Sequence, residues 1–146
     1  MLQQASNKLP IPKRMRWSDS RVQFVRPVHW LVVLYGEEVI PLTLLGLDAG
    51  HYSRGHRFHH SSPIGIDNPN TYVEQLREAY VIADMQERRD IIQAQVEKAG
   101  KEAGGTAVID DDLLTEVAAL VEWPIPLVGH FDEGFLRVPQ EAIITA

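Results

Sequence analysis

The sequence predicts an α+β fold in which a mixed or antiparallel sheet packs with helices. Runs of β-branched and aromatic residues concentrate in the first half, as in Val28–Tyr35, whereas helical patterns with capping residues dominate the second half. Hydrophobic residues make up 45% of the chain, enough for a core, and 146 residues fit one domain of ordinary size. We therefore expect a disordered tail over residues 1–8 and a single α+β domain over residues 9–146.

The strand signal is clearest around Gly36. Val28–Tyr35 and Val39–Leu45 are apolar runs on either side of the turn residues Gly36-Glu37-Glu38, a pattern typical of a β-hairpin. Pro41 places the second strand at a sheet edge, because proline cannot donate a ladder hydrogen bond. Further strands are expected at residues 22–25, 58–66, 125–131 and 135–138, with a loop over residues 46–55.

Two helices are predicted by capping residues followed by apolar residues at helical spacing. Asp84 precedes the clearest pattern, Met85–Ala103, which Gly104-Gly105 ends. Asp110–Asp112 precede the second, which Pro124 is expected to end. A short helix beginning at Asn70 or Thr71, and a helical turn beginning at Pro139, complete the expected elements.

Charge is unevenly distributed along the chain, whose net charge is −6. Residues 1–57 carry eight basic and four acidic side chains, a balance of +4, and residues 58–146 have a balance of −10. A basic face on an acidic body would attract phosphate groups. The alternative is an ordinary solvated surface, since asymmetry in sequence need not be asymmetry in space.

Composition excludes some classes of site. The chain has no cysteine, so disulfides and thiolate metal ligands are excluded. Its longest apolar run, from Trp30 to Tyr35, is strand-sized, while a membrane span needs roughly 20 residues. We expect no membrane association, and a cytoplasmic setting is compatible with this composition.

Two short segments combine basic and aromatic residues in a way that suits RNA. Arginine forks match phosphate oxygens, and aromatic rings can stack on unpaired bases. The alternatives are a charged edge strand for the first segment and ion pairs with downstream carboxylates for the second. The candidate RNA-binding residues are Lys13, Arg14, Arg16 and Trp17 in the first segment, and Arg54, His56, Arg57 and Phe58 in the second.

Catalytic and metal sites are not predicted. His51, His56, His59 and His60 are close in sequence, but their spacing matches no zinc motif, so we expect no metal site. The chain has no nucleophile elbow, P-loop or dinucleotide fingerprint. Glu116 and Glu122 on the acidic helix could form a carboxylate pair, but a solvated or packing-edge helix face is the simpler interpretation. We therefore expect no catalytic residue.

Five blocks along almost the whole chain carry a family resemblance. They are Leu9–Trp17; Phe24–Leu31; Arg54–Phe58; Leu120–Pro124 leading to Gly129, Phe131-Asp132-Glu133 and Phe135-Leu136; and Val138-Pro139 followed by Glu141. In this order, the blocks resemble the beta subunit of bacterial heterotetrameric glycyl-tRNA synthetase.

This resemblance implies an α2β2 class II enzyme that attaches glycine to tRNA(Gly) using ATP. In that family the alpha subunit holds the active site and uses ATP and Mg²⁺, whereas the beta subunit handles tRNA. The chain is then expected to be an inner piece of the N-terminal half of a multidomain beta subunit, without a cofactor of its own. Its expected partners are the alpha subunit, tRNA(Gly) and the remaining beta-subunit domains.

By analogy, the region is similar to the B3/B4-type module of phenylalanyl-tRNA synthetase beta subunits. That module edits mischarged tRNA, an activity that glycine does not require, because a small pocket excludes larger amino acids. We therefore expect a non-catalytic module for tRNA handling and scaffolding that is inactive by itself. Two alternatives stay open, purely structural bracing and a hydrolytic, editing-like domain.

Overall fold

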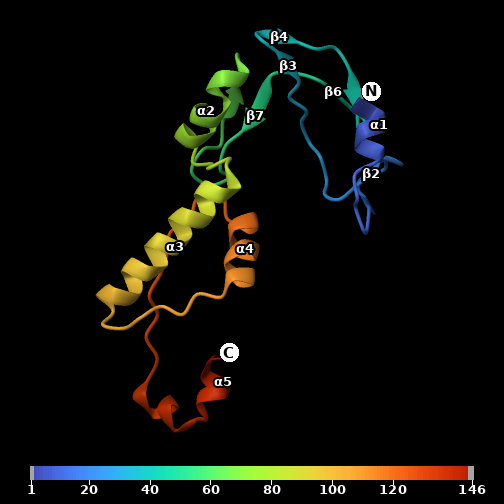
Figure 1. Ribbon diagram of the computed structural model, residues 1–146. Helices are drawn as coiled ribbons and strands as arrows, with labels where there is room; N and C mark the ends of the chain where they lie inside the picture. Colours follow the sequence, from blue (N-terminus) through green and yellow to red (C-terminus); the bar gives the residue numbers. More distant parts are fainter. Residues whose placement is uncertain (1, 145–146) are drawn as a thin grey trace.

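The computed structural model describes residues 2–144 and has the predicted α+β character, with helices and small antiparallel sheets (Figure 1). Four two-stranded sheets fill the first half, and helices fill the second. The strands are β1 (Met15–Arg16), β2 (Gln23–Phe24), β3 (Leu34–Tyr35), β4 (Glu38–Val39), β5 (Thr43–Leu44), β6 (Leu47–Asp48), β7 (Tyr52–Arg54) and β8 (Pro63–Gly65). The helices are α1 (Leu2–Asn7), α2 (Tyr72–Glu78), α3 (Met85–Glu102), α4 (Asp111–Leu120) and α5 (Gln140–Ile144), with 3₁₀ turns η1 (Pro69–Thr71) and η2 (Glu133–Arg137).

Each sheet is a hairpin between consecutive strands. The predicted hairpin at Gly36 is confirmed, although its strands are shorter than expected: Tyr35 pairs with Glu38, and Gly36 supplies a left-handed φ of 60°. The predicted loop over residues 46–55 is wrong in part, because this range contains both β6 and β7. Leu45 and Gly46 form a second tight turn there, with φ of 55° and 79°. Positive φ at both central residues matches the right-handed twist of the strands.

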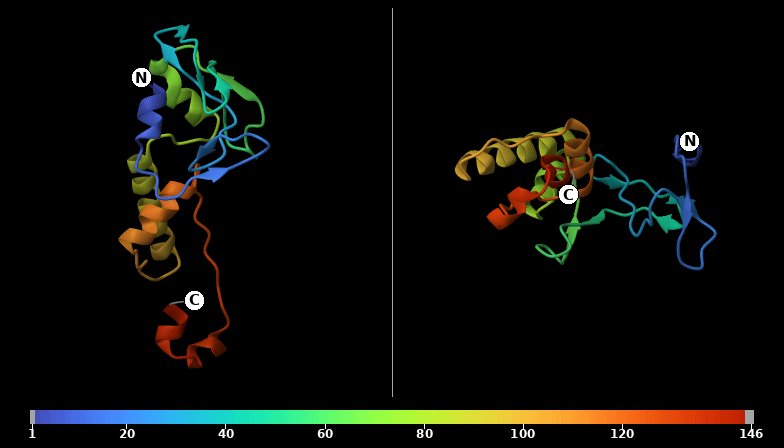
Figure 2. Two further views of the ribbon diagram at one scale, coloured as in Figure 1. Left: turned by 90° about the vertical axis from the view of Figure 1, so that its right-hand side faces the viewer. Right: turned by 90° about the horizontal axis from the view of Figure 1, so that it is seen from below.

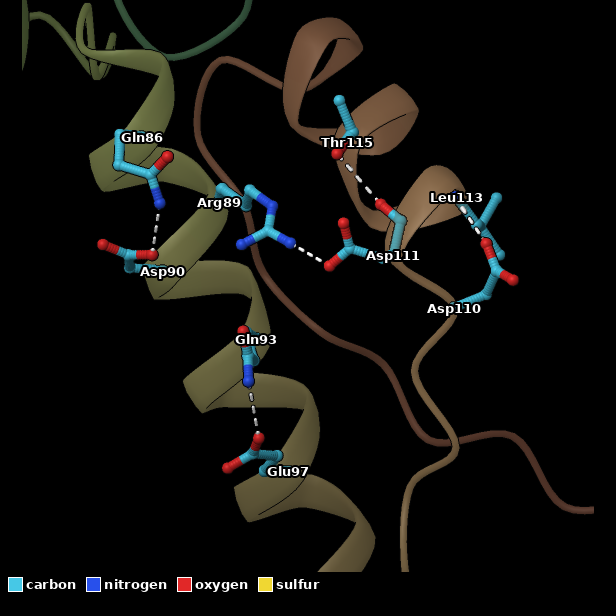
Figure 3. Close-up of polar contacts among 9 residues, drawn as sticks. All are labelled: Gln86, Arg89, Asp90, Gln93, Glu97, Asp110, Asp111, Leu113 and Thr115. Carbon is cyan, nitrogen blue, oxygen red and sulfur yellow. Dashed lines mark hydrogen bonds and ion pairs between the residues drawn. The ribbon is translucent and has the colours of Figure 1, made fainter.

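The α3–α4 pair is the best-defined part of the helical half. Both predicted caps are confirmed: the Asp84 carboxylate accepts from the Glu87 N–H, and the Asp110 carboxylate accepts from the Leu113 N–H, each at 2.8 Å. Between the helices lies a small apolar core, and an ion pair joins Arg89 of α3 to Asp111 of α4 (Figure 3). The core contains Ile92, Leu114 and Ala118, with Val96, Ile109 and Val117 packed against it.

A second buried group connects α2 to the β7–β8 hairpin. Ile66, directly after β8, is 1% exposed, and Leu76 and Ala79 at the end of α2 are also buried. The Gln75 side-chain amide donates to the Gly65 carbonyl oxygen at 2.9 Å. These contacts fix the hairpin against the helix (Figure 1).

The segment after α4 differs from the prediction. Helix α4 ends at Leu120, before Pro124, and residues 125–131 form no strand, because no strand of the described chain pairs with them. Residues 135–138 are not a strand either: Asp132 caps η2 by accepting from the Gly134 N–H at 2.7 Å. The predicted helical turn after Pro139 is confirmed as α5. Figure 2 shows this segment extending away from the hairpins, so that α5 lies far from α1.

The N-terminal segment has helical backbone. Helix α1 has no buried residue, and the Arg14 guanidinium donates to the Asn7 carbonyl oxygen at 3.1 Å. The division of the chain into a tail over residues 1–8 and one domain over residues 9–146 stays a prediction. No helix within residues 2–144 has the length and apolar character that crossing a membrane requires.

Candidate nucleic-acid interface

The second basic-aromatic segment begins at the end of β7 and crosses the end of α2. Gly55 lies so close to α2 that a Cβ there would be 2.6 Å from both the Cβ and the carbonyl oxygen of Ala79. That carbonyl oxygen accepts from the His56 N–H at 2.9 Å. Only glycine permits this approach, so the sequence Arg54-Gly55-His56 fixes where the two flanking side chains leave the backbone.

His56 organises the turn that follows. Its Nδ1 accepts from the backbone N–H groups of Phe58 and His59, both at 3.3 Å, and its carbonyl oxygen accepts from the His60 N–H at 2.9 Å. Since Nδ1 is an acceptor, the neutral ring carries its proton on Nε2. The predicted strand over residues 58–66 begins only at Pro63, because residues 57–59 are used in this turn.

A cavity of about 520 Å³ opens beside this turn. Three separate parts of the chain line it: a residue before β3, the segment between β7 and β8, and the segment after α4. The lining residues are Trp30, Arg54, Gly55, His56, Arg57, Phe58, His60, Ser61 and Glu122. All four candidates of the second segment are therefore brought together at one site.

The side chains of the two arginines of this cavity are unpaired within the described residues. Among the residues that the structure describes, neither Arg54 nor Arg57 forms an ion pair or a side-chain hydrogen bond. The alternative in which they pair with downstream carboxylates is thus not what the fold shows, although Glu122 lines the same cavity. Cations left unpaired at a concave surface attract anionic ligands.

Aromatic rings extend from the cavity across the surface. Phe58 is 84% exposed and lies 6.1 Å from the ring of His56. His56 stacks on His59 at 4.5 Å, and His59 lies 5.2 Å from Tyr80. Tyr80 then meets Trp123 edge-on at 5.3 Å, all distances being between ring centroids. An exposed ring next to unpaired cations is the arrangement that stacks on unpaired bases.

The first basic-aromatic segment is elsewhere. Lys13, Arg14, Arg16 and Trp17 lie on or beside β1, and none of them lines the cavity. Figure 1 shows the β1–β2 hairpin well apart from β7. Lys13 and Arg16 are exposed, whereas Arg14 is bonded to α1 and Trp17 is half-buried. The two predicted segments therefore form two separate surfaces.

Five residues that line the cavity were not among the predicted RNA-binding residues: Trp30, Gly55, His60, Ser61 and Glu122. Glu122 was expected on a helix face, but α4 ends at Leu120, and the Glu122 carbonyl oxygen accepts from the Ile82 N–H at 3.0 Å. This bond joins two loops that are far apart in sequence, so no local sequence pattern predicts it. Glu122 precedes Pro124 by two residues, and proline disfavours helical backbone in the residue before it. Pro124 was therefore the sequence feature that could have placed Glu122 beyond the end of the helix.

His60, which also lines the cavity, forms a local hydrogen bond. His60 Nδ1 lies 3.1 Å from the Ser62 carbonyl oxygen and donates to it. In the described part of the chain, no hydrogen bond joins His60 to the hydroxyl of its neighbour Ser61. Within residues 2–144, no three His, Asp or Glu side chains gather closely enough to hold one metal ion.

Comparison with known proteins identifies the family. The family model described as glycyl-tRNA synthetase beta subunit matches residues 1–146. The chain is 53% identical over 145 residues to a glycine–tRNA ligase beta subunit of Pseudomonas putida, covering 99% of this chain and 21% of that protein. It is 52% identical over 146 residues to the subunit of the same name from Chromohalobacter salexigens, covering 100% of this chain and 21% of that protein. The chain therefore spans about a fifth of the length of these relatives, and it belongs to the glycyl-tRNA synthetase beta-subunit family.

Proposed function

We propose that this chain serves glycyl-tRNA synthesis in the cytoplasm as a non-catalytic module that contacts tRNA(Gly). The relatives are named as beta subunits of glycine–tRNA ligase, and that name implies an alpha subunit as partner. We assign the aminoacylation active site, with its ATP and Mg²⁺, to the alpha subunit. The role left to this chain is to hold RNA.

The observation that carries the proposal is the cavity with two unpaired guanidiniums beside an exposed ring. Arg54 and Arg57 can each donate two parallel hydrogen bonds to a phosphate, and Phe58 offers its face to a base. The net charge of −6 repels RNA from the rest of the surface, so binding concentrates where cations are unpaired. The separate surface at Lys13 and Arg16 supplies further phosphate contacts.

The test is fluorescence-anisotropy titration of labelled tRNA(Gly) with the full-length beta subunit at several salt concentrations. We expect the Arg54→Ala/Arg57→Ala variant to bind at least roughly 100-fold more weakly, because charge-assisted hydrogen bonds contribute about 1.5–3 kcal/mol each and the variant loses at least two of them. The slope of log affinity against log salt should fall by about 1 to 2, one unit for each lost phosphate contact.

The matched control removes the same charge elsewhere. Lys98→Ala/Lys101→Ala takes two positive charges from the exposed face of α3, away from the cavity. This variant should retain affinity to within about twofold, since it changes only the distant field of the protein. Equal losses in both double variants would mean that net charge, and not the cavity, governs tRNA binding.

A second role, bracing of the assembly, is favoured by a different observation. The segment from the end of α4 onward presents large apolar side chains to solvent, among them Leu120, Ile125 and Leu127, the last 92% exposed. Such a patch indicates a surface that another domain or subunit covers. Hydrogen exchange of the full-length beta subunit, with and without the alpha subunit, tests this role. Protection over residues 120–131 only in the complex would assign the patch to the alpha subunit, and protection in both states to the remaining beta-subunit domains.

A further inference from the structure

The cavity lined by Trp30, by the end of β7 with the turn that follows it, and by the segment after α4 contains a group that phosphate binding alone does not explain. Glu122 lines it together with Arg54 and Arg57. A carboxylate weakens phosphate binding by repulsion, so a surface built only to hold the RNA backbone would not place one there. Within the described residues, its side chain has no ion pair and no hydrogen bond. Its carboxylate oxygens are free acceptors.

The backbone holds this carboxylate in place relative to the arginines. The Glu122 carbonyl oxygen is bonded to the Ile82 N–H at 3.0 Å, and the Ala79 carbonyl oxygen is bonded to the His56 N–H at 2.9 Å. Ala79 and Ile82 are themselves buried, at 2% and 4% exposure. The segment 79–82 is therefore hydrogen-bonded to both sides of the cavity. Ala79 bonds to the segment that carries Arg54 and Arg57, and Ile82 bonds to Glu122.

A ligand for this site must carry complementary groups. It needs an anionic group for Arg54 and Arg57, a flat apolar body for Phe58 or Trp30, and hydrogen-bond donors for the Glu122 carboxylate. A nucleotide has all three: its phosphate is anionic, its base is flat, and the edges of most bases carry N–H donors. The cavity volume of about 520 Å³ lies within the range of ligand pockets and admits one nucleotide.

The acceptor-only character of a carboxylate discriminates among the bases. Guanine presents two adjacent donors, N1–H and the N2 amino group, that match the two oxygens of a carboxylate. Adenine and cytosine present a single amino group beside a ring acceptor, which the carboxylate repels. Uracil presents one N–H between two carbonyl oxygens. A single unpaired guanine is therefore the base that Glu122 favours.

We propose that this cavity binds one unpaired nucleotide of RNA and that Glu122 makes guanine the preferred base. The inference rests on the proposed function, since it concerns the same site, and adds the nucleotide class and the residue that selects it. Arg54 and Arg57 hold the phosphate whatever the base, Phe58 and Trp30 stack on the ring, and Glu122 accepts from its edge. Affinity and base preference thus depend on different residues.

The test uses the full-length beta subunit and short single-stranded RNA probes that are all uridine except for one central G, A, C or U. We expect the G probe to bind about 5- to 150-fold more tightly than the U probe, the range that a bidentate base contact of about 1–3 kcal/mol gives. Glu122→Gln, which replaces one acceptor oxygen by a donor amide, should narrow this difference to about twofold. The matched control Glu116→Gln, on the exposed side of α4, should retain the full preference.

The possible outcomes distinguish guanine selection by Glu122 from the proposed tRNA-contact role. A guanine preference that is lost in Glu122→Gln, and not in Glu116→Gln, supports guanine selection by Glu122. Equal affinity for all four probes in the unaltered protein overturns the base selection, while tRNA(Gly) binding that still needs Arg54 and Arg57 leaves the tRNA-contact role standing. If tRNA(Gly) binding is indifferent to both arginines, the proposed function itself is wrong. Far-UV circular dichroism of each variant confirms that the fold is retained.

Discussion

The α3–α4 pair and the cavity beside the β7–β8 hairpin both contain arginines and carboxylates, but only the first region pairs them. In the helix pair, Arg89 bonds to Asp111 and Asp110 caps α4 (Figure 3). The Lys98 ammonium lies 3.8 Å from the Glu102 carboxylate. Around the cavity, Arg54, Arg57 and Glu122 have no such partners among the described residues. Charge in the helix pair therefore serves the fold, and the unpaired charge in the cavity agrees with the proposal that it binds a ligand.

The largest effect is expected when a core side chain of the helix pair is truncated. Leu114→Ala should lower the free energy of unfolding by about 2–5 kcal/mol, because Leu114 is buried between α3 and α4 and the lost side chain leaves a cavity. Urea denaturation followed by circular dichroism measures the loss. The neighbouring Leu113→Ala, at a position 59% exposed, should cost about 0.5 kcal/mol or less. If Leu114→Ala also changed the salt dependence of tRNA binding, the two regions would not be independent.

The next test acts where the cavity joins α2. Gly55→Ala should destabilise the protein by about 1–3 kcal/mol, because the new methyl group would collide with the backbone of Ala79 and disturb the bond to His56. The same variant should weaken tRNA binding, since Arg54 and Arg57 are positioned by this contact. Gly50→Ala is the matched control, as a Cβ there would meet nothing within 4 Å. Unchanged affinity in Gly55→Ala would show that the arginines do not need this geometry.

The smallest effect is expected at the start of α4. Asp110→Ala should cost about 1 kcal/mol, the usual contribution of a side-chain cap, and Asp110→Asn should recover most of it because asparagine caps equally well. Both values come from the same urea titration. A full loss in Asp110→Asn would mean that Asp110 acts through its charge at the helix terminus and not through its hydrogen bond.

The elements that the sequence predicted correctly are those specified by neighbouring residues. Asp84 and Asp110 each bond to an N–H three residues ahead, so both helix starts are visible in a few letters of sequence. The expected strand at 125–131 failed for the opposite reason. An apolar run becomes a strand only when it pairs with another strand. In the described chain no strand pairs with residues 125–131, and the local sequence could not reveal this.

The candidate site divides in the same way. Arg54, His56, Arg57 and Phe58 are adjacent in sequence, and the prediction that they act together needed only local reasoning. Glu122 reaches the cavity through a backbone bond to Ile82, a contact between loops that no periodicity reveals. Sequence therefore predicted the basic side of the cavity and missed the acidic one, because only the fold brings the two together.

Trp30 provides an intrinsic fluorescence probe of the cavity. Trp30 lines it and is 44% exposed, whereas Trp123 is held against Tyr80 and Trp17 lies beside β1. A base that stacks on an indole quenches its emission, so occupancy of the cavity should dim Trp30 selectively. Binding can then be followed on unlabelled RNA by intrinsic fluorescence, with Trp30→Phe as the variant in which the signal disappears while the ring surface remains.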